Sequence, residues 1–344
     1  MILRLFLVVC AAAAVGTWLL RHYALARRVL DVPNDRSSHN VPTPRGGGLS
    51  IVVAFLTGTV GLAALGAVTR PVALALVGGG AIVAVVGFVD DHRHVPARWR
   101  LLAHFAAAAW VLWWLGGLPP LVLFGRVMSL GLAGSALAAV ALVWLINLYN
   151  FMDGIDGIAG IETVTVCLGA IALYLLRPSP APEWVLPGLL AAATLGFLLW
   201  NFPPAKIFMG DGGSGFLGLT LGTLAMRAGA IAPHWFWSWI ILLGVFVVDA
   251  TVTLLRRLQR REKVYQAHRS HAYQHAAVQC ASHRTVTLAV ASINLLWLLP
   301  WALLVGTGRL EGVAGVLIAY TPLVWVALRL EAGCTARLPR IAGV

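Results

Sequence analysis

Charged side chains are scarce in this chain of 344 residues: 11% of them are Asp, Glu, Lys or Arg, whereas 60% are hydrophobic. The mean hydropathy of +0.85 lies well outside the range of a soluble globular domain. The 4 cysteines are scattered without metal-ligand spacing, so they indicate neither a disulfide framework nor a metal cluster. The sequence also lacks a soluble domain, a low-complexity tract and a convincing internal repeat. These absences place the chain in a membrane.

Long apolar runs fill most of the sequence. A run of about 20 residues crosses the roughly 30 Å of hydrocarbon in a bilayer. Eleven candidate spans lie at residues 2–20, 49–68, 71–89, 101–115, 130–148, 158–176, 184–200, 214–226, 236–255, 286–305 and 313–330. They predict an all-α, polytopic transmembrane protein of about 11 transmembrane helices, with residues 1–344 forming a single integral-membrane domain. The first run resembles a cleavable signal peptide, but we expect it to be retained, because ten further spans follow it.

Lysine and arginine predict how these spans are oriented. With the N-terminus outside, the loops on one side of the membrane carry sixteen Lys and Arg residues and the opposite loops carry five. The positive-inside rule then predicts that the N-terminus lies outside and the C-terminus in the cytoplasm. We expect the membrane to be the bacterial inner membrane, in which the N-terminus would be periplasmic. In a membrane protein the location of the charges matters more than the net charge of +12, so we expect no nucleic-acid partner.

Five polar segments fall on the predicted cytoplasmic side. They are residues 21–48, 90–100, 149–157, 201–213 and 256–285. Nothing in the choice of apolar runs required the five segments to share one side. We therefore expect catalysis on the cytoplasmic face, with these segments as its loops.

Two pairs of aspartates stand out in these segments. Asp90 and Asp91 end an apolar run, and adjacent carboxylates suit a hard divalent cation such as Mg²⁺. The alternatives are a solvated helix end, or neutralisation by Arg93. Asp153 and Asp156 lie three apart, so in a helix or turn they point the same way and can share a cation. The alternative for this pair is a simple Asp-Gly turn.

A glycine-rich loop carries a fifth aspartate. Asp211 lies in Gly-Asp-Gly-Gly-Ser-Gly, where glycine frees backbone N–H groups at the start of a helix, an arrangement that favours phosphate. A flexible turn between helices is the alternative. Just before it, Lys206 adds a cation that suits phosphate, and Asn201 adds a hydrogen-bonding amide.

The last large cytoplasmic loop contains His268-Arg269-Ser-His271. The two histidines can form a pair that transfers protons or, with Arg269, contacts phosphate. The alternative is a basic stretch that only sets topology or binds anionic lipid headgroups. Asp249 lies inside the ninth span, where an ionisable side chain is a functional candidate, and pairing with Arg256 or Arg257 is its alternative.

Read in order, Pro-Arg-Gly-Gly-Gly, Asp-Asp, Asn-x-x-Asn-x-x-Asp-Gly-x-Asp-Gly, Gly-Asp-Gly-Gly-Ser and His-Arg-Ser-His resemble the motifs of the polyprenyl-phosphate N-acetylhexosamine 1-phosphate transferases, the MraY/WecA-like family. The resemblance covers nearly the whole chain. It implies transfer of an N-acetylamino-sugar 1-phosphate from a UDP-sugar to undecaprenyl phosphate, with Mg²⁺, or alternatively Mn²⁺, as the cofactor. The products would be undecaprenyl-diphosphate-sugar and UMP. A homodimer is compatible with this resemblance.

The resemblance also implies roles for particular residues. Asp211, Asp90 and Asp91 look like the metal site, with Asp90 and Asp91 close to the lipid phosphate. The implied catalytic residues are Asp90, Asp91, Asp153, Asp156, His268 and His271. The implied substrate-binding residues are Arg45, Asn150, Asn201, Lys206 and Arg269. The variant His-Arg-Ser-His looks more like the initiators of surface polysaccharide or O-antigen synthesis than like the peptidoglycan enzymes.

Two other classes fit parts of the pattern. Membrane prenyltransferases also hold a prenyl diphosphate with Mg²⁺ and aspartate-rich helix ends, but the Pro-Arg-Gly-Gly-Gly and His-Arg-Ser-His segments have no place in them. A transporter should carry ionisable residues near the bilayer midplane on discontinuous helices. Here they cluster on one face, and only Asp249 leans toward the interior.

Overall fold

The computed structural model describes residues 2–33, 41–93, 95–176, 182–262 and 268–334. Residues 34–40, 94 and 263–267, which belong to three of the predicted cytoplasmic loops, lie outside these ranges, as do residues 335–344 of the predicted cytoplasmic tail. The helices are α1 Ile2–Arg27, α2 Leu49–Ala64, α3 Arg70–His92, α4 Ala97–Leu115, α5 Gly131–Met152, α6 Ile158–Leu175, α7 Val185–Asn201, α8 Asp211–Ile231, α9 Pro233–Leu242, α10 Gly244–Gln259, α11 Ala272–Cys280, α12 His283–Ser292, the π-helix η1 Ile293–Leu298, α13 Leu299–Gly306 and α14 Gly312–Arg329. The strands are β1 Leu30–Asp31, β2 Thr43–Pro44, β3 Leu121–Leu123 and β4 Arg126–Met128.

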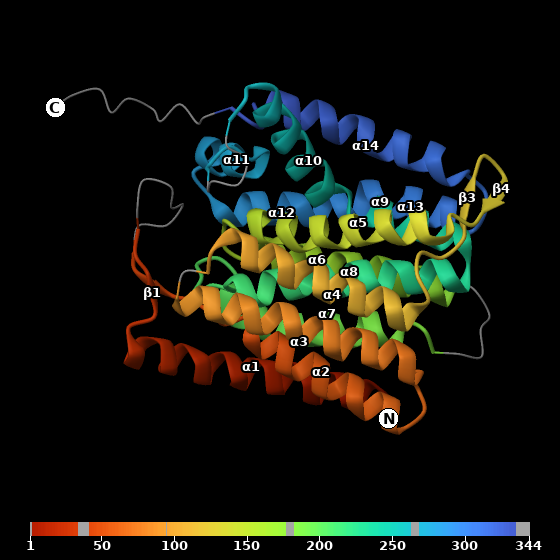
Figure 1. The fold of residues 1–344 in the computed structure, drawn as a ribbon. Helices are drawn as coiled ribbons and strands as arrows, with labels where there is room; N and C mark the ends of the chain where they lie inside the picture. Colours follow the sequence, from red (N-terminus) through yellow and green to blue (C-terminus); the bar gives the residue numbers. More distant parts are fainter. Residues whose placement is uncertain (1, 34–40, 94, 177–181, 263–267, 335–344) are drawn as a thin grey trace.

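The long helices form one bundle, which confirms the all-α fold (Figure 1). The strands make two short antiparallel pairs, β1 with β2 and β3 with β4, which lie at opposite ends of the bundle. Helix α8 runs through the centre, packed against α3, α5 and α9, and is buried along most of its length. Its glycines let neighbouring backbones approach closely, as small residues do between membrane helices.

Six helices are long and apolar enough to cross a membrane. They are α1, α3, α5, α6, the continuous segment His283–Gly306, and α14. Helices α9 and α10 add a seventh if they are taken together as one span. The shorter α2 and α7 are also apolar. The protein is therefore a polytopic membrane protein, and the count of eleven spans stays a prediction.

The ninth predicted span, residues 236–255, was wrong as a single helix. Helices α9 and α10 meet at Leu243 with a bend of 70°. After the bend, α10 packs against α14 and α11, so Asp249 does not lie on a straight continuation of α9. The predicted eighth span, residues 214–226, is also longer than expected, because α8 begins at Asp211 and ends at Ile231.

Candidate functional site

Asp91 joins two of the predicted motifs at the end of α3. Its side chain is only 2% exposed. Its Oδ1 atom accepts a hydrogen bond from Nε of Arg45 at 3.0 Å and another from the backbone N–H of Asp211 at 3.1 Å. The carboxylate thus holds Arg45 and the first N–H groups of α8 together, where a negative charge also complements the helix dipole.

Glycine is needed where these segments touch. A Cβ atom on Gly87 would overlap the backbone of Gly212, so α3 and α8 could not approach as they do. Gly210 has φ of 79°, a left-handed conformation that favours glycine, and a Cβ there would lie 2.5 Å from Oδ2 of Asp91. The glycine-rich motifs therefore serve close packing around Asp91 in this structure.

Arg100 connects the second carboxylate of α3 with α8. It reaches from the first turn of α4 to Oδ2 of Asp90 and lies 3.5 Å from Oδ2 of Asp211. The backbone N–H of Val95 donates to the other oxygen of Asp90 at 2.8 Å. Arg45 lies 4.0 Å from Asp211 on the other side. Asp211 is therefore flanked by two guanidinium groups.

The aspartates of three motifs share one electrostatic environment. Burial and the neighbouring Asp91 carboxylate raise the pKa of Asp211 to about 6. Burial, with further repulsion from Asp211 and Asp91, raises the pKa of Asp153 well above its usual range. Both shifts show that negative charge accumulates here despite Arg45 and Arg100.

A cavity of about 180 Å³ opens beside this cluster, between α3, α4, α5 and α8. The polar side chains that line it are Asp90, Arg100, His104, Asn147, Asn150 and Asp211. Leu101, Ile146 and Phe151 are among its apolar lining residues. Asn150 also donates to the hydroxyl of Ser214 at 3.3 Å, which ties α5 to α8. A charged headgroup and the start of an apolar chain could both be accommodated here.

Asp156 is held differently from Asp153. Its Oδ2 atom accepts from the backbone N–H of Ala205 at 2.9 Å, and its Oδ1 atom lies 3.3 Å from Nδ1 of His283. Its carbonyl accepts from the hydroxyl of Thr287 at 2.8 Å. Asp156 therefore joins the start of α6 to α12 and to the loop before α8. Its place in a shared cation site with Asp153 stays a prediction.

Asn201 and Lys206 lie apart from the carboxylate cluster. Asn201 is 3% exposed; it accepts from the N–H of Gly157 at 3.1 Å and donates to the carbonyl of Ile207 at 2.9 Å. Both the oxygen and the nitrogen of its amide are thus bonded to backbone groups. The exposed Lys206 places its Nζ atom 5.4 Å from the centre of the Trp200 ring. Their roles as substrate contacts stay predictions.

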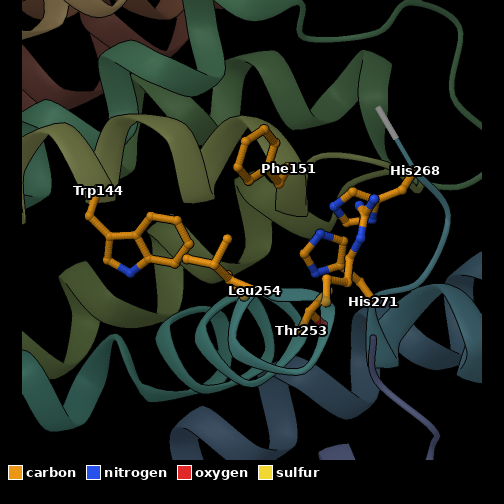
Figure 2. A pocket seen from close by; sticks show the side chains of 8 residues that line it. Trp144, Phe151, Thr253, Leu254, His268 and His271 are labelled. Atoms are coloured by element: carbon orange, nitrogen blue, oxygen red, sulfur yellow. The ribbon is translucent and has the colours of Figure 1, made fainter. Parts of the chain in front are cut away.

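The histidine loop, residues 268–271, lies against the end of α5. The rings of His268 and His271 stack with centres 4.9 Å apart, and Phe151 of α5 faces both (Figure 2). The hydroxyl of Tyr273 donates to the carbonyl of Phe151 at 2.9 Å. Residues 268–273 are thereby brought beside the end of α5, next to the segment that carries Asp153.

Asp249 has partners other than the arginines considered from the sequence. It accepts hydrogen bonds from the N–H groups of Ala272 and Tyr273, both at 2.9 Å, and lies 3.3 Å from Nδ1 of His271. The guanidinium of Arg257 bonds Glu262 at 2.9 Å. Asp249 is thus a part of the histidine loop's support.

Comparison with known proteins places this arrangement in a family. The model of glycosyl transferase family 4 matches residues 73–229. A phospho-N-acetylmuramoyl-pentapeptide-transferase of Synechococcus elongatus is 30% identical over 264 residues, which are 71% of this chain and 69% of that protein. The chain belongs to glycosyl transferase family 4.

Other relatives of this family-4 chain act on N-acetylglucosamine according to their names. A probable undecaprenyl-phosphate N-acetylglucosaminyl 1-phosphate transferase of Bacillus subtilis is 29% identical over 304 residues, 85% of this chain and 82% of the relative. A decaprenyl-phosphate N-acetylglucosaminephosphotransferase of Mycolicibacterium smegmatis is 29% identical over 275 residues, 71% of this chain and 67% of the relative. The range matched by the family model includes the five motif aspartates but neither Arg45 nor the histidine loop.

The family-4 site fits a divalent cation by its charge rather than by a preformed cage. Among the side chains that the structure describes, no three His, Cys, Asp or Glu residues converge as metal ligands. Mg²⁺ is usually held by only one or two carboxylates, together with waters and substrate phosphates. Asp90 and Asp91 each pair closely with an arginine, whereas Asp211 lies farther from both guanidinium groups, at 3.5 and 4.0 Å, and both Asp211 and Asp153 are repelled by neighbouring carboxylates, a repulsion that a cation would relieve. A hard cation would therefore be stabilised most beside Asp211 and Asp153.

Sequence reasoning missed two residues of this family-4 site. Arg100 was counted only as a topology charge, and His283 was included only as part of a basic loop. The position of Arg100 in the first turn of the helix after Asp90 was an available signal. His283 lies 127 positions from Asp156, and no residue pattern links the two.

Proposed function

We propose that this chain transfers an N-acetylamino-sugar 1-phosphate from a UDP-sugar to undecaprenyl phosphate, with Mg²⁺ as the cofactor. The observation that carries this proposal is the convergence of Asp91, Asp153 and Asp211 with Arg45 and Arg100 beside a cavity lined by both charged and apolar side chains. Membership of family 4, and relatives named as polyprenyl-phosphate sugar phosphotransferases, support it.

The reaction would be a displacement at the β-phosphorus of the UDP-sugar. An oxygen of the lipid phosphate forms the new P–O bond, and the bond to the UMP oxygen breaks, so UMP leaves with the bonding electrons. Phosphoryl transfer needs mainly positioning and neutralisation of spread negative charge. Arg100 and Arg45 are placed to meet that charge, and Mg²⁺ near Asp211 would neutralise more of it.

Asp90 is assigned a positioning role in this reaction. A phosphate monoester has a second pKa of about 6, so the lipid phosphate is largely dianionic at neutral pH and can attack without losing a proton. Asp90 already bonds Arg100 and the N–H of Val95, which holds the guanidinium toward Asp211. A rate that falls below about pH 6 in both the wild type and Asp90→Asn follows from this assignment. Loss of that pH dependence in Asp90→Asn would assign the base role to Asp90.

The cavity between α3, α4, α5 and α8 suits the lipid acceptor. Leu101, Ile146 and Phe151 line it with apolar side chains, and Asp90 and Arg100 line it with charged ones. The acceptor would enter sideways from the bilayer, and the nucleotide sugar would arrive from the cytoplasm. The names of the Bacillus and Mycolicibacterium relatives make UDP-N-acetylglucosamine the first donor to test, with initiation of a surface polysaccharide such as O-antigen as the proposed role.

UMP release tests this function. The detergent-purified protein is given undecaprenyl phosphate and a panel of UDP-N-acetylamino sugars, with Mg²⁺ or with a chelator. We expect UMP only when lipid, Mg²⁺ and the correct donor are all present, and we expect Asp211→Asn to abolish it. Folded protein that releases no UMP with any donor, or that releases it equally with chelator, would contradict the proposal.

A further inference from the structure

The Asp249 carboxylate supports the histidine loop through several hydrogen bonds. It is 6% exposed and lies on α10, just after the 70° bend. Its Oδ1 atom accepts from the N–H of Ala272 at 2.9 Å and from the hydroxyl of Thr253 at 3.1 Å, and its Oδ2 atom accepts from the N–H of Tyr273 at 2.9 Å. These bonds satisfy the first N–H groups of α11, which the helix itself leaves without partners.

The same carboxylate determines which nitrogen of His271 carries a proton. Oδ1 of Asp249 lies 3.3 Å from Nδ1 of His271. An ionised carboxylate can only accept a hydrogen bond, so Nδ1 must be the donor. The opposite nitrogen, Nε2, is buried and has no hydrogen-bond partner among the residues that the structure describes. A buried polar atom of this kind calls for a ligand or a water.

The surroundings of His271 connect it with the carboxylate cluster. The imidazole lines a small cavity with His268, Thr253 and Phe151, and its volume of about 10 Å³ is close to the space of one water (Figure 2). Phe151 also lines the larger cavity that contains Asp90 and Asp211. One aromatic side chain therefore forms a wall of both cavities.

We propose that Asp249 is a positioning residue that presents Nε2 of His271 to the diphosphate of the nucleotide sugar. This inference rests on the proposed function. The diphosphate of the nucleotide sugar carries no proton at neutral pH, so it can only accept a hydrogen bond. Since Nδ1 already carries one proton, Nε2 can donate only when the ring carries a second proton and is an imidazolium. The Asp249 carboxylate accepts the Nδ1 proton of that ring, and the bond from Nε2 to phosphate is charge-assisted. Asp249 itself touches no substrate.

A double-mutant cycle tests the coupling. Asp249→Asn keeps the shape of the side chain and one acceptor oxygen for α11 but removes the charge. We expect it to lower kcat/KM for UMP release about 10- to 100-fold, the loss of one hydrogen bond to a charged group. In a His271→Gln background the same change should cost less than about 3-fold, because its effect passes through the imidazole. Equal losses in both backgrounds would overturn the inference in favour of a purely structural anchor.

Glu262→Gln is the matched control for the loss of a carboxylate near α10. The change removes the negative charge of a carboxylate that bonds Arg257. Arg257 lines the same small cavity as His271, but Glu262 does not contact His271. We expect its kcat/KM to stay within about 2-fold of the wild type, since a partly exposed ion pair contributes little. A loss as large as that of Asp249→Asn would show that any charge change around α10 has this effect and would also overturn the inference.

A spectroscopic measurement separates this inference from the proposed function. Nitrogen-15 spectra of histidine-labelled full-length protein, with the His271 signals assigned by their absence in His271→Gln, report which ring nitrogens are protonated. We expect both ring nitrogens to be protonated in the wild type with UDP bound, and only one of them in Asp249→Asn with UDP bound. An unchanged pattern would reject the positioning role even in an active enzyme. The expected pattern in a protein that releases no UMP would instead reject the proposed function alone.

Discussion

A single side chain, Arg100, links the carboxylates of Asp90 and Asp211. We expect Arg100→Ala to lower kcat for UMP release about 10- to 100-fold, because it removes a cation from a place where negative charge is in excess. Arg98→Ala is the matched control: its guanidinium lies over the Trp99 ring, 5.6 Å from the centre, in the same turn of α4. A loss of the same size in both variants would show that Arg100 acts only through the general charge of the loop.

How far residue types predict contacts differs between the motifs. Asp91 and Asp211 were expected at one metal site, and the structure does bring them together, because glycine lets α3 and α8 touch. Asn201 has the same kind of side chain as Asn150, yet it is enclosed between backbone groups. Sequence supplies the donors and acceptors, but which of them remain open to a substrate depends on tertiary packing.

Helices were the most predictable elements, because long apolar runs in a membrane must satisfy their backbone groups internally. The bend between α9 and α10 was difficult to predict from the sequence, since Leu243 lies inside an apolar run without proline. Gly244 was an available signal, but a lone glycine does not by itself predict a bend of 70°. The short strands β3 and β4 were likewise not expected. Both the bend and the strand pair depend on how neighbouring helices pack.

The contact between α3 and α8 yields a prediction about stability. Gly87→Ala should lower the free energy of unfolding by about 1–3 kcal/mol, because the added methyl group overlaps the backbone of Gly212. Gly61→Ala in α2 is the matched control, since a Cβ there meets nothing within 4 Å. It should be neutral or stabilise by up to about 1 kcal/mol. Thermal unfolding in detergent measures both, and equal melting temperatures for the two variants would contradict the close approach.

The buried side chains of Glu162 and Asn294 form a polar pair that joins α6 to η1. Neither residue belongs to the motifs described above. Nδ2 of Asn294 donates to Oε2 of Glu162 at 2.6 Å, and both side chains are at most 1% exposed. The signal was available, because a carboxyl group inside an apolar run is unusual. The π-helix that carries Asn294 lies in the same continuous segment as His283, the partner of Asp156.

Removing one member of this pair should cost more than removing both. Asn294→Leu leaves the Glu162 carboxyl buried without its donor and should destabilise the protein by about 1–3 kcal/mol. The double variant Glu162→Leu, Asn294→Leu should recover part of that loss, because the buried carboxyl is gone and the hydroxyl of Thr165, the other acceptor of Asn294, still donates to backbone carbonyls. Melting temperatures of the two variants decide the point; a double variant less stable than Asn294→Leu would mean that the pair makes a net favourable contribution.

At the level of the whole protein, the proposed orientation can be tested with a native cysteine. Cys280 is exposed at the end of α11, on the predicted cytoplasmic side. In a variant that keeps only this cysteine, a membrane-impermeant maleimide should label inverted vesicles and leave intact spheroplasts unlabelled. Phe124→Cys, at a position 79% exposed between β3 and β4 on the predicted periplasmic side, should show the reverse pattern. Labelling of Cys280 from outside would reverse the predicted topology.

The central claim is that sugar and β-phosphate move together onto the lipid. The most direct test supplies the accepted UDP-sugar with radioactive label on its β-phosphorus and follows the label after reaction with undecaprenyl phosphate and Mg²⁺. Transfer of the sugar 1-phosphate predicts that the label enters the lipid fraction and that the released nucleotide is unlabelled UMP. Labelled UDP in the aqueous fraction, with an unlabelled glycosylated lipid, would mean transfer of the sugar alone and would contradict the account.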